Sequence, residues 1–178
     1  MIDLVGVLAR RRVIAGFLLA CLFLWVARPT PALLACGGSV ALLGLAIRFW
    51  ASGHIRKTRE LAVDGPYSLV RNPLYVGSFV VGLGIILAGG LPWALVAFAV
   101  LFVAAYVRKM RQEEAHLANL FGEAFGEYCR RVPRFVPRLA VPTRGRGFDL
   151  RQVIRHHEYE LWLGIIAVFA VLGWKAWR

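Results

Sequence analysis

Long apolar stretches without charged residues alternate with charged stretches along the chain. The charge-free stretches cover residues 13–27, 29–47, 72–107 and 161–174. A helix needs about 20 apolar residues to cross the hydrocarbon of a bilayer, and about 17 suffice in some cases. The second stretch meets this length, and the third is nearly twice as long. The pattern therefore predicts membrane-spanning helices.

The third stretch is interrupted near its middle by the sequence Gly-Gly-Leu-Pro at positions 89–92. Glycine and proline favour a tight turn, so two spans are predicted, at 74–88 and 91–107. The first and last stretches are short, but flanking arginines can snorkel and tryptophans can anchor a helix at an interface. The last could instead be an interfacial helix. We predict an all-α fold, a polytopic membrane bundle of about five spans that forms one domain (1–178).

The composition supports a membrane protein. Of the 178 residues, 59% are apolar and 18% are charged, and the mean hydropathy is +0.62. An ordinary soluble domain carries about 25% charged residues. This composition excludes disorder and disfavours a water-soluble globule, because too little polar surface is available to cover one.

The net charge of +12 points to an anionic partner, either nucleic acid or a membrane surface. If the N-terminus is cytoplasmic, all of the 22 lysines and arginines except Arg28, Lys175 and Arg178 fall on the cytoplasmic side of the five-span bundle. Membrane proteins favour this orientation. We therefore expect anionic lipid as a partner and no nucleic acid, since the sequence contains no basic module interleaved with aromatic residues.

The N-terminal sequence Arg10-Arg11-Arg12 and the apolar run after it resemble a signal peptide. Arg28 interrupts the apolar region, and the run ends without a convincing small-residue cleavage site, so we expect the segment to be retained. The compact length and the lack of an organelle-targeting segment favour a bacterial or archaeal inner membrane protein.

The segment 61–77 is the first of two that contain candidate chemistry. Gly65 and Pro66 predict a turn, and Pro73 suits the first position of the following helix. Asn72 is then the expected N-cap of that helix, whose free N–H groups favour an anion. Arg71 can clamp a carboxylate in a bidentate manner. The glycines at 77, 82 and 84 allow a close backbone approach to a ligand or simply pack helices together.

The second segment begins at residue 108, after the fourth predicted span. Its Glu113 and Glu114 could bind a ligand, although Glu113 could also form a surface ion pair with Lys109 four residues earlier. Prolines at both ends of 133–137 exclude a regular helix and predict an extended strap, in which Phe135 could cover a flat heteroaromatic ligand. We predict no metal site, because neither the three cysteines nor the adjacent histidines at 156 and 157 have ligand spacing.

Taken together and in order, these motifs resemble the isoprenylcysteine carboxyl methyltransferase family, which is related to the membrane phospholipid N-methyltransferases. The matching pieces are Gly65-Pro66-Tyr67, Arg71-Asn72-Pro73-Leu74-Tyr75-Val76-Gly77, Glu113-Glu114, Phe121-Gly122, Tyr128 and Val132-Pro133-Arg134-Phe135-Val136-Pro137. They span about residues 45–138. Residues 139–178, a linker and the C-terminal span, lie beyond them, and the sequence assigns this part no role.

The resemblance implies an enzyme that binds S-adenosylmethionine in a pocket at the cytoplasmic face and methylates a lipophilic acceptor, a carboxylate, thiol or lipid amine, arriving from the bilayer. Arg71 and Glu113 are the expected catalytic residues. The expected cofactor-binding residues are Val63, Gly65, Tyr67, Arg71, Asn72, Pro73, Tyr75, Gly77, Glu113, Glu114, Tyr128, Pro133, Arg134 and Phe135.

Two positions depart from the family pattern. Asn72 stands where the family often has histidine, so a protonatable group there is in doubt. Lys109 stands where an arginine is common, although Arg108 or Arg111 could substitute for it. Two other functions stay open: an NADPH-dependent membrane reductase of the sterol-reductase type, and a small membrane transporter without catalytic activity.

Overall fold

The computed structural model describes residues 16–55, 60–143, 145, 147–155 and 158–178. Every regular element among these residues is helical, which confirms the predicted all-α class. The long helices are α2 (Pro31–Ser52), α3 (Pro73–Ala88), α4 (Pro92–Phe121) and α7 (Glu158–Ala176). The shorter ones are Gly16–Val26, the 3-10 helix η1 (Gly65–Ser68), α5 (Glu123–Arg131) and α6 (Leu150–Arg155). The predictions made for Arg10–Arg12, His156 and His157 lie outside the described residues.

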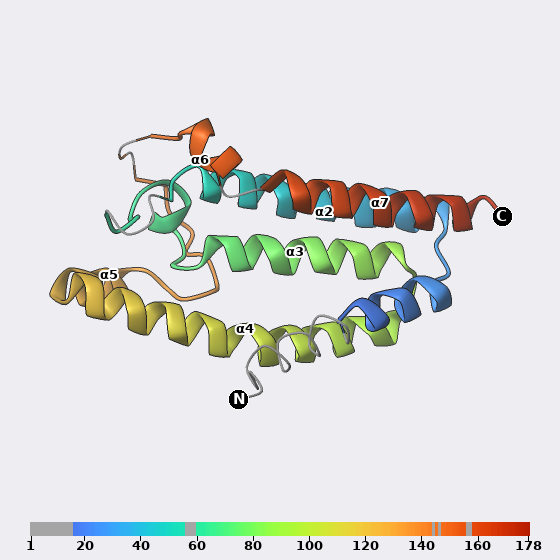
Figure 1. The fold of residues 1–178 in the computed structure, drawn as a ribbon, viewed down its shortest axis with the longest axis horizontal. Coiled ribbons are helices and arrows are strands. Elements are labelled where there is room, and N and C mark those ends of the chain that lie inside the picture. Colours follow the sequence, from blue (N-terminus) through green and yellow to red (C-terminus); the bar gives the residue numbers. More distant parts are fainter. Residues whose placement is uncertain (1–15, 56–59, 144, 146, 156–157) are drawn as a thin grey trace, which may run out of the picture.

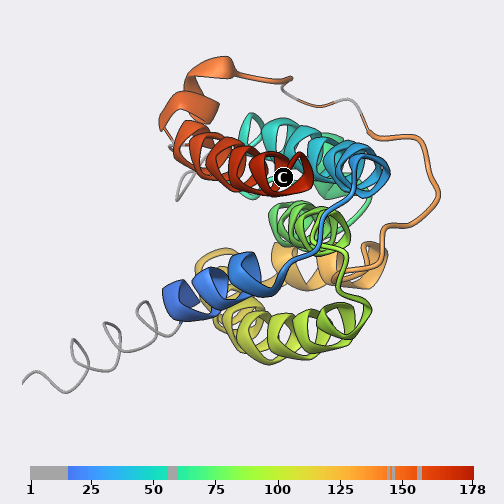
Figure 2. The same ribbon diagram turned by 90° about the vertical axis from the view of Figure 1, so that its right-hand side faces the viewer.

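The long helices lie side by side, with their lengths in one direction (Figure 1). Helix α3 lies between α2 and α4, and α7 packs on α2 (Figure 2). The elements η1, α5 and α6 gather at one end of this bundle, and the C-terminus lies at the opposite end. We call the former the site end, because it brings together both segments that contain candidate chemistry.

Helices α2 and α3 are in the closest contact because glycines line both sides of their interface. A Cβ atom at Gly84 would come within 2.5 Å of the Ala41 nitrogen and the Gly37 oxygen. A Cβ atom at Gly44 would come equally close to the Val81 nitrogen. Small residues allow helix backbones to approach closely, as is common in membranes.

The predicted turn between the third and fourth spans is confirmed. Helix α3 ends at Ala88 and α4 begins at Pro92. Gly90 between them has φ +68°, a backbone conformation that glycine adopts without steric cost. Proline is also the first residue of α3, at Pro73 as expected, since its missing N–H costs nothing at that position.

Three helices in the described residues are long and apolar enough to cross a membrane: α2, α4 and α7. Gly16–Val26 and α3 are shorter apolar helices, so the count of five spans stays a prediction. Helix α4 continues without a break beyond the predicted span that ends at residue 107, as far as Phe121. One rigid helix therefore connects the apolar bundle to the acidic pair Glu113-Glu114.

Candidate functional site

Four elements meet at the site end of the bundle: the start of α3, the second half of α4, α5, and the strap that follows α5. The strap, residues 132–137, has no helix, as its prolines predicted. Its backbone is bonded to the chain just before α3, because the Arg71 nitrogen donates to the Pro133 oxygen at 2.8 Å and the Arg138 nitrogen donates to the Leu69 oxygen at 3.0 Å. These bonds hold both candidate segments against each other.

Glu114 is the centre of the polar contacts. Its Oε2 accepts from Nη2 of Arg134 at 2.6 Å, and Nε of Arg134 lies 3.1 Å from both carboxylate oxygens. Nη1 of Arg71 lies 3.3 Å from Oε1. Glu114 is 12% exposed, so this carboxylate is partly shielded from water. Its hydrogen bonds raise the pKa of Arg134, because they favour the charged guanidinium.

Asn72 occupies the N-cap position of α3, but its side chain makes no capping hydrogen bond. The predicted N-cap position of Asn72 is therefore confirmed. The amide Nδ2 instead donates to the Arg134 carbonyl at 3.1 Å and to Glu114 Oε1 at 3.4 Å. These acceptors come from the strap and from α4, and they draw the amide away from the start of the helix. Asn72 joins three elements in place of capping one.

Glu113 points to a different partner. Its Oε1 accepts from the Tyr75 hydroxyl at 2.7 Å. Nζ of Lys109 lies 6.0 Å from the centre of the Tyr75 ring, and Tyr106 contacts the same ring edge-on at 5.1 Å. Glu113 is exposed, whereas Glu114 is half-buried. The two neighbouring carboxylates therefore differ in surroundings: Glu114 pairs with arginines, whereas Glu113 is accessible to solvent.

Arg71 is directed into this cluster from the turn before α3. Its Nη1 donates to Sγ of Cys129 at 2.8 Å as well as facing Glu114. Its Nε is buried and has no hydrogen-bond partner in the described part of the chain. Cys129 was not foreseen as a site residue, and its place in a basic stretch of α5 was the one signal available. A buried donor without a partner is costly, and bound ligands are one way in which proteins satisfy such a group.

Tyr67 and Tyr128 connect η1 to α5. The Tyr128 hydroxyl donates to the Tyr67 carbonyl at 2.7 Å, and both side chains are buried. Burial raises the pKa of both phenols, because it disfavours the phenolate. The pair thus holds η1, which precedes α3, against α5. Contact of Tyr67 or Tyr128 with a cofactor stays a prediction.

Four of the predicted site residues lie away from the Glu114 cluster. Val63 is 45% exposed, and a Cβ atom at Gly65 would meet the His54 ring. A Cβ atom at Gly77 would meet Arg48 and the backbone of α2, which gives this glycine a packing role. Phe135 lies 5.9 Å from Phe79 and 6.2 Å from Phe102, centre to centre, so it closes an aromatic row between α3 and α4.

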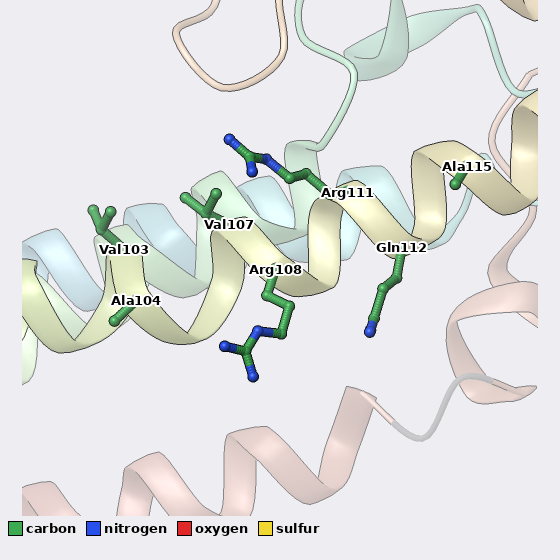
Figure 3. A pocket seen from close by; sticks show the side chains of 7 residues that line it. All are labelled: Val103, Ala104, Val107, Arg108, Arg111, Gln112 and Ala115. Carbon is green, nitrogen blue, oxygen red and sulfur yellow. The ribbon is translucent and has the colours of Figure 1, made fainter.

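A hollow of about 520 Å³ lies along α4, and its lining does not include Glu113 or Glu114. Figure 3 shows its side chains, with Arg108 and Gln112 directed to one side and Arg111 to the other. The lining residues are Val103, Ala104, Val107, Arg108, Arg111, Gln112 and Ala115. Several recur every three or four residues and so share a helix face. Glu114 follows Arg111 by three residues and Val107 by seven, so the centre of the cluster lies on the same side of α4 as part of this lining.

Within the described ranges, no group of three or more histidine, cysteine, aspartate or glutamate side chains is arranged to hold a metal ion.

Comparison with known proteins identifies the family. The model of the phospholipid methyltransferase family matches residues 32–124. The cobalt-zinc-cadmium resistance protein CzcN of Cupriavidus metallidurans is 39% identical over 143 residues, 73% of this chain and 63% of that protein. The nickel-cobalt-cadmium resistance protein NccN of Alcaligenes xylosoxydans xylosoxydans is 40% identical over 111 residues, 58% of this chain and 51% of that protein.

Protein-S-isoprenylcysteine O-methyltransferase of Schizosaccharomyces pombe is 32% identical over 81 residues, 46% of this chain and 34% of that protein. The chain therefore spans less than two thirds of the length of these curated relatives. No solved structure matches it. The family match covers the start of α3 and the acidic pair of α4, and it confirms the resemblance to the isoprenylcysteine methyltransferases. The chain belongs to the phospholipid methyltransferase family of membrane methyltransferases.

Proposed function

We propose that the chain transfers a methyl group from S-adenosylmethionine to a lipophilic acceptor at the membrane surface. The observation that carries this proposal is the convergence of Arg71, Glu113 and Glu114 at the site end, where the buried Nε of Arg71 has no hydrogen-bond partner among the described residues. Family membership supports methyl transfer as the reaction class. The cofactor and the acceptor are the parts that we propose.

The charges of the cluster fit the polar groups of S-adenosylmethionine. The Nε of Arg71, which no group in the described ranges engages, can donate to the cofactor carboxylate, a charge-assisted bond of the stronger kind. Glu113 is the better acceptor for the cofactor ammonium or ribose diol, because it is exposed and accepts a hydrogen bond from the neutral Tyr75 hydroxyl, whereas Glu114 pairs with two arginines. Glu114 contacts Arg71, Arg134 and Asn72, so we assign it the role of holding these side chains in place.

The cofactor would supply an activated methyl group: the bond from its carbon to the acceptor forms as its bond to the sulfonium sulfur breaks, and a neutral thioether is left. A thiol or amine acceptor would release its proton to solvent. The chain contributes alignment and exclusion of water, the main protein contributions to an in-line displacement. Tyr106 stacks on Phe102 at 4.1 Å, and Phe79 lies 5.1 Å from Phe102, centre to centre. This aromatic row leads from Tyr75 along α3 and α4, and it suits an apolar acceptor (a lipophilic carboxylate, thiol or lipid amine) that arrives from the bilayer.

We further propose that the site end faces the cytoplasm of a bacterial or archaeal cell, with the N-terminus on the same side. The basic residues favour this orientation. The hollow on α4 has apolar valines at one end and Arg108 and Arg111 at the other. This order suits an anionic lipid, whose acyl chain would follow the valines and whose headgroup would meet one of the arginines.

Calorimetric titration of the full chain in nanodiscs tests the cofactor. S-adenosylmethionine and S-adenosylhomocysteine should each bind saturably, and Arg71→Gln and Glu113→Gln should each weaken binding at least tenfold. Arg131→Gln is the matched control, because Arg131 is exposed and pairs with Glu127 on the surface of α5. It should bind as the native chain does.

A labelled methyl donor, incubated with the nanodiscs and a total lipid extract, then identifies the acceptor class by the product that takes up the label. Titration with NADPH is the competing arm. Selective binding of NADPH would replace the proposal with a membrane reductase, and binding of neither ligand would refute an enzymatic role of the cluster.

A further inference from the structure

Helix α7 begins with a buried charge that reaches across the bundle. Glu158 is its first residue and is 4% exposed. Its carboxylate accepts two hydrogen bonds from Arg48 of α2, at 2.8 Å from Nη2 and 3.1 Å from Nε. The pairing is bidentate, the geometry that fixes both side chains most firmly. An acid in the first turn also suits the positive end of the helix dipole.

The same arginine holds the first turn of α3. Nη1 of Arg48 donates to the Ser78 hydroxyl at 2.6 Å and lies 3.3 Å from the Leu74 carbonyl. The Ser78 hydroxyl in turn donates to the Leu74 carbonyl at 2.9 Å. Gly77 leaves the space for this arrangement, because a Cβ atom there would come within 2.6 Å of Cγ of Arg48. One guanidinium thus bonds to α3 and α7 at once.

The start of α3, to which Arg48 bonds, also contributes residues to the candidate site. Leu74 lies between Pro73 and Tyr75, and Tyr75 bonds to Glu113 on the neighbouring helix. Asn72, one residue before α3, bonds to Glu114 and to the strap. The start of α3 is therefore bonded to Arg48 of α2 and to the acidic pair of α4. Its position depends on both.

A buried ion pair is a weak source of stability, since its desolvation offsets most of the attraction between the charges. Its value here lies in geometry: it fixes where α3 begins relative to α2 and α7. Helix α7 also lies outside residues 32–124, the part matched by the family. We propose that Glu158, acting through Arg48, is a positioning residue for the cofactor site, and that α7 is thereby a working part of that site.

This inference rests on the proposed function for its binding readout and on geometry alone for a second readout. Glu158→Gln removes the charge and keeps the shape of the side chain. Hydrogen exchange of the amides in segment 73–78, in which Pro73 itself has no N–H, should become at least tenfold faster, and S-adenosylmethionine should bind at least tenfold more weakly. Glu158→Asp keeps the charge and should restore part of both effects.

Lys175→Gln is the matched control, because Lys175 ties the other end of α7 to the carbonyls of Leu24 and Trp25, each at 2.7 Å. It should lower the melting temperature but leave exchange at 73–78 and cofactor affinity within twofold of the native values. If Glu158→Gln does not fold, Arg48→Lys tests the same contact with the charge retained, and the same two changes are expected.

Equal effects of Glu158→Gln and Lys175→Gln on exchange at 73–78 would overturn the inference, since α7 would then act only as general support. Unchanged exchange in both Glu158→Gln and Arg48→Lys would also overturn it. Absence of S-adenosylmethionine binding in the native chain would instead refute the proposed function, and the exchange readout would still decide the positioning role.

Discussion

The replacement Glu114→Gln tests whether this carboxylate organises the candidate site. The change removes the charge shared by two arginines and keeps the side-chain volume. The pair with Arg134 counts as a surface pair worth about 0–1 kcal/mol, because that guanidinium is 44% exposed. The pair with Arg71 joins side chains that are 15% and 12% exposed. This ion pair lies between a surface pair and a fully buried one, for which removal of one partner costs about 3–5 kcal/mol.

We therefore expect Glu114→Gln to lower the free energy of unfolding by about 2 kcal/mol, most of it from the contact with Arg71. For a chain of this size, 1 kcal/mol shifts the melting temperature by about 2–4 °C, so a fall of roughly 4–8 °C is expected. Thermal unfolding in nanodiscs, followed by circular dichroism, measures this shift.

Glu127→Gln supplies the comparison, because Glu127 pairs with Arg131 in an exposed i,i+4 contact on α5. Its loss should change stability by less than about 0.5 kcal/mol. If the two variants melt at the same temperature, the arginines around Glu114 find other partners at no cost, and the central role of Glu114 is refuted.

Three further predictions follow from other contacts. Gly84→Ala should lower the melting temperature by several degrees, because its Cβ would meet the α2 backbone within 2.5 Å. Gly164 has open space around it, so Gly164→Ala should leave the melting temperature unchanged. Equal melting temperatures of the two variants would contradict the close packing of α2 and α3. Tyr75→Phe should weaken S-adenosylmethionine binding a few-fold, measured by calorimetry, because Glu113 loses its hydrogen-bond donor; unchanged affinity would separate this contact from the site. Burial raises the folded-state pKa of Tyr128 above its ordinary value of 10.0. The contribution of this shift to stability should therefore be complete below about pH 10 and lost as the pH rises further. Melting curves from pH 8 to 11.5 should show this loss of stability, and Tyr128→Phe should make the loss smaller.

Local rules predicted much of the fold. The position of Pro73 marked the start of α3, and the glycines and proline at 89–92 marked the turn before α4. Both signals act within a few residues of where they stand, so the sequence is sufficient to read them. The same reasoning predicted that the strap at 132–137 would not be helical.

Contacts between distant residues could not be predicted in this way. The sequence predicted the N-cap position of Asn72 but not the bonds of its amide to acceptors on α4 and the strap. The bond of Arg71 to Cys129 joins residues 58 positions apart, and that of Arg48 to Glu158 joins residues 110 positions apart. No periodicity connects such positions, since the approach of their helices depends on the packing of the whole bundle.

The continuity of α4 ties the acidic pair to the thickness of the lipid around it. Its 30 residues extend for about 45 Å, longer than the roughly 30 Å of a bilayer's hydrocarbon. A helix in a thinner membrane adjusts by tilting. Since α4 is continuous between its apolar half and Glu113, we expect a change in its tilt to move that carboxylate together with the span. Membrane thickness is then a variable that should influence the geometry of the site.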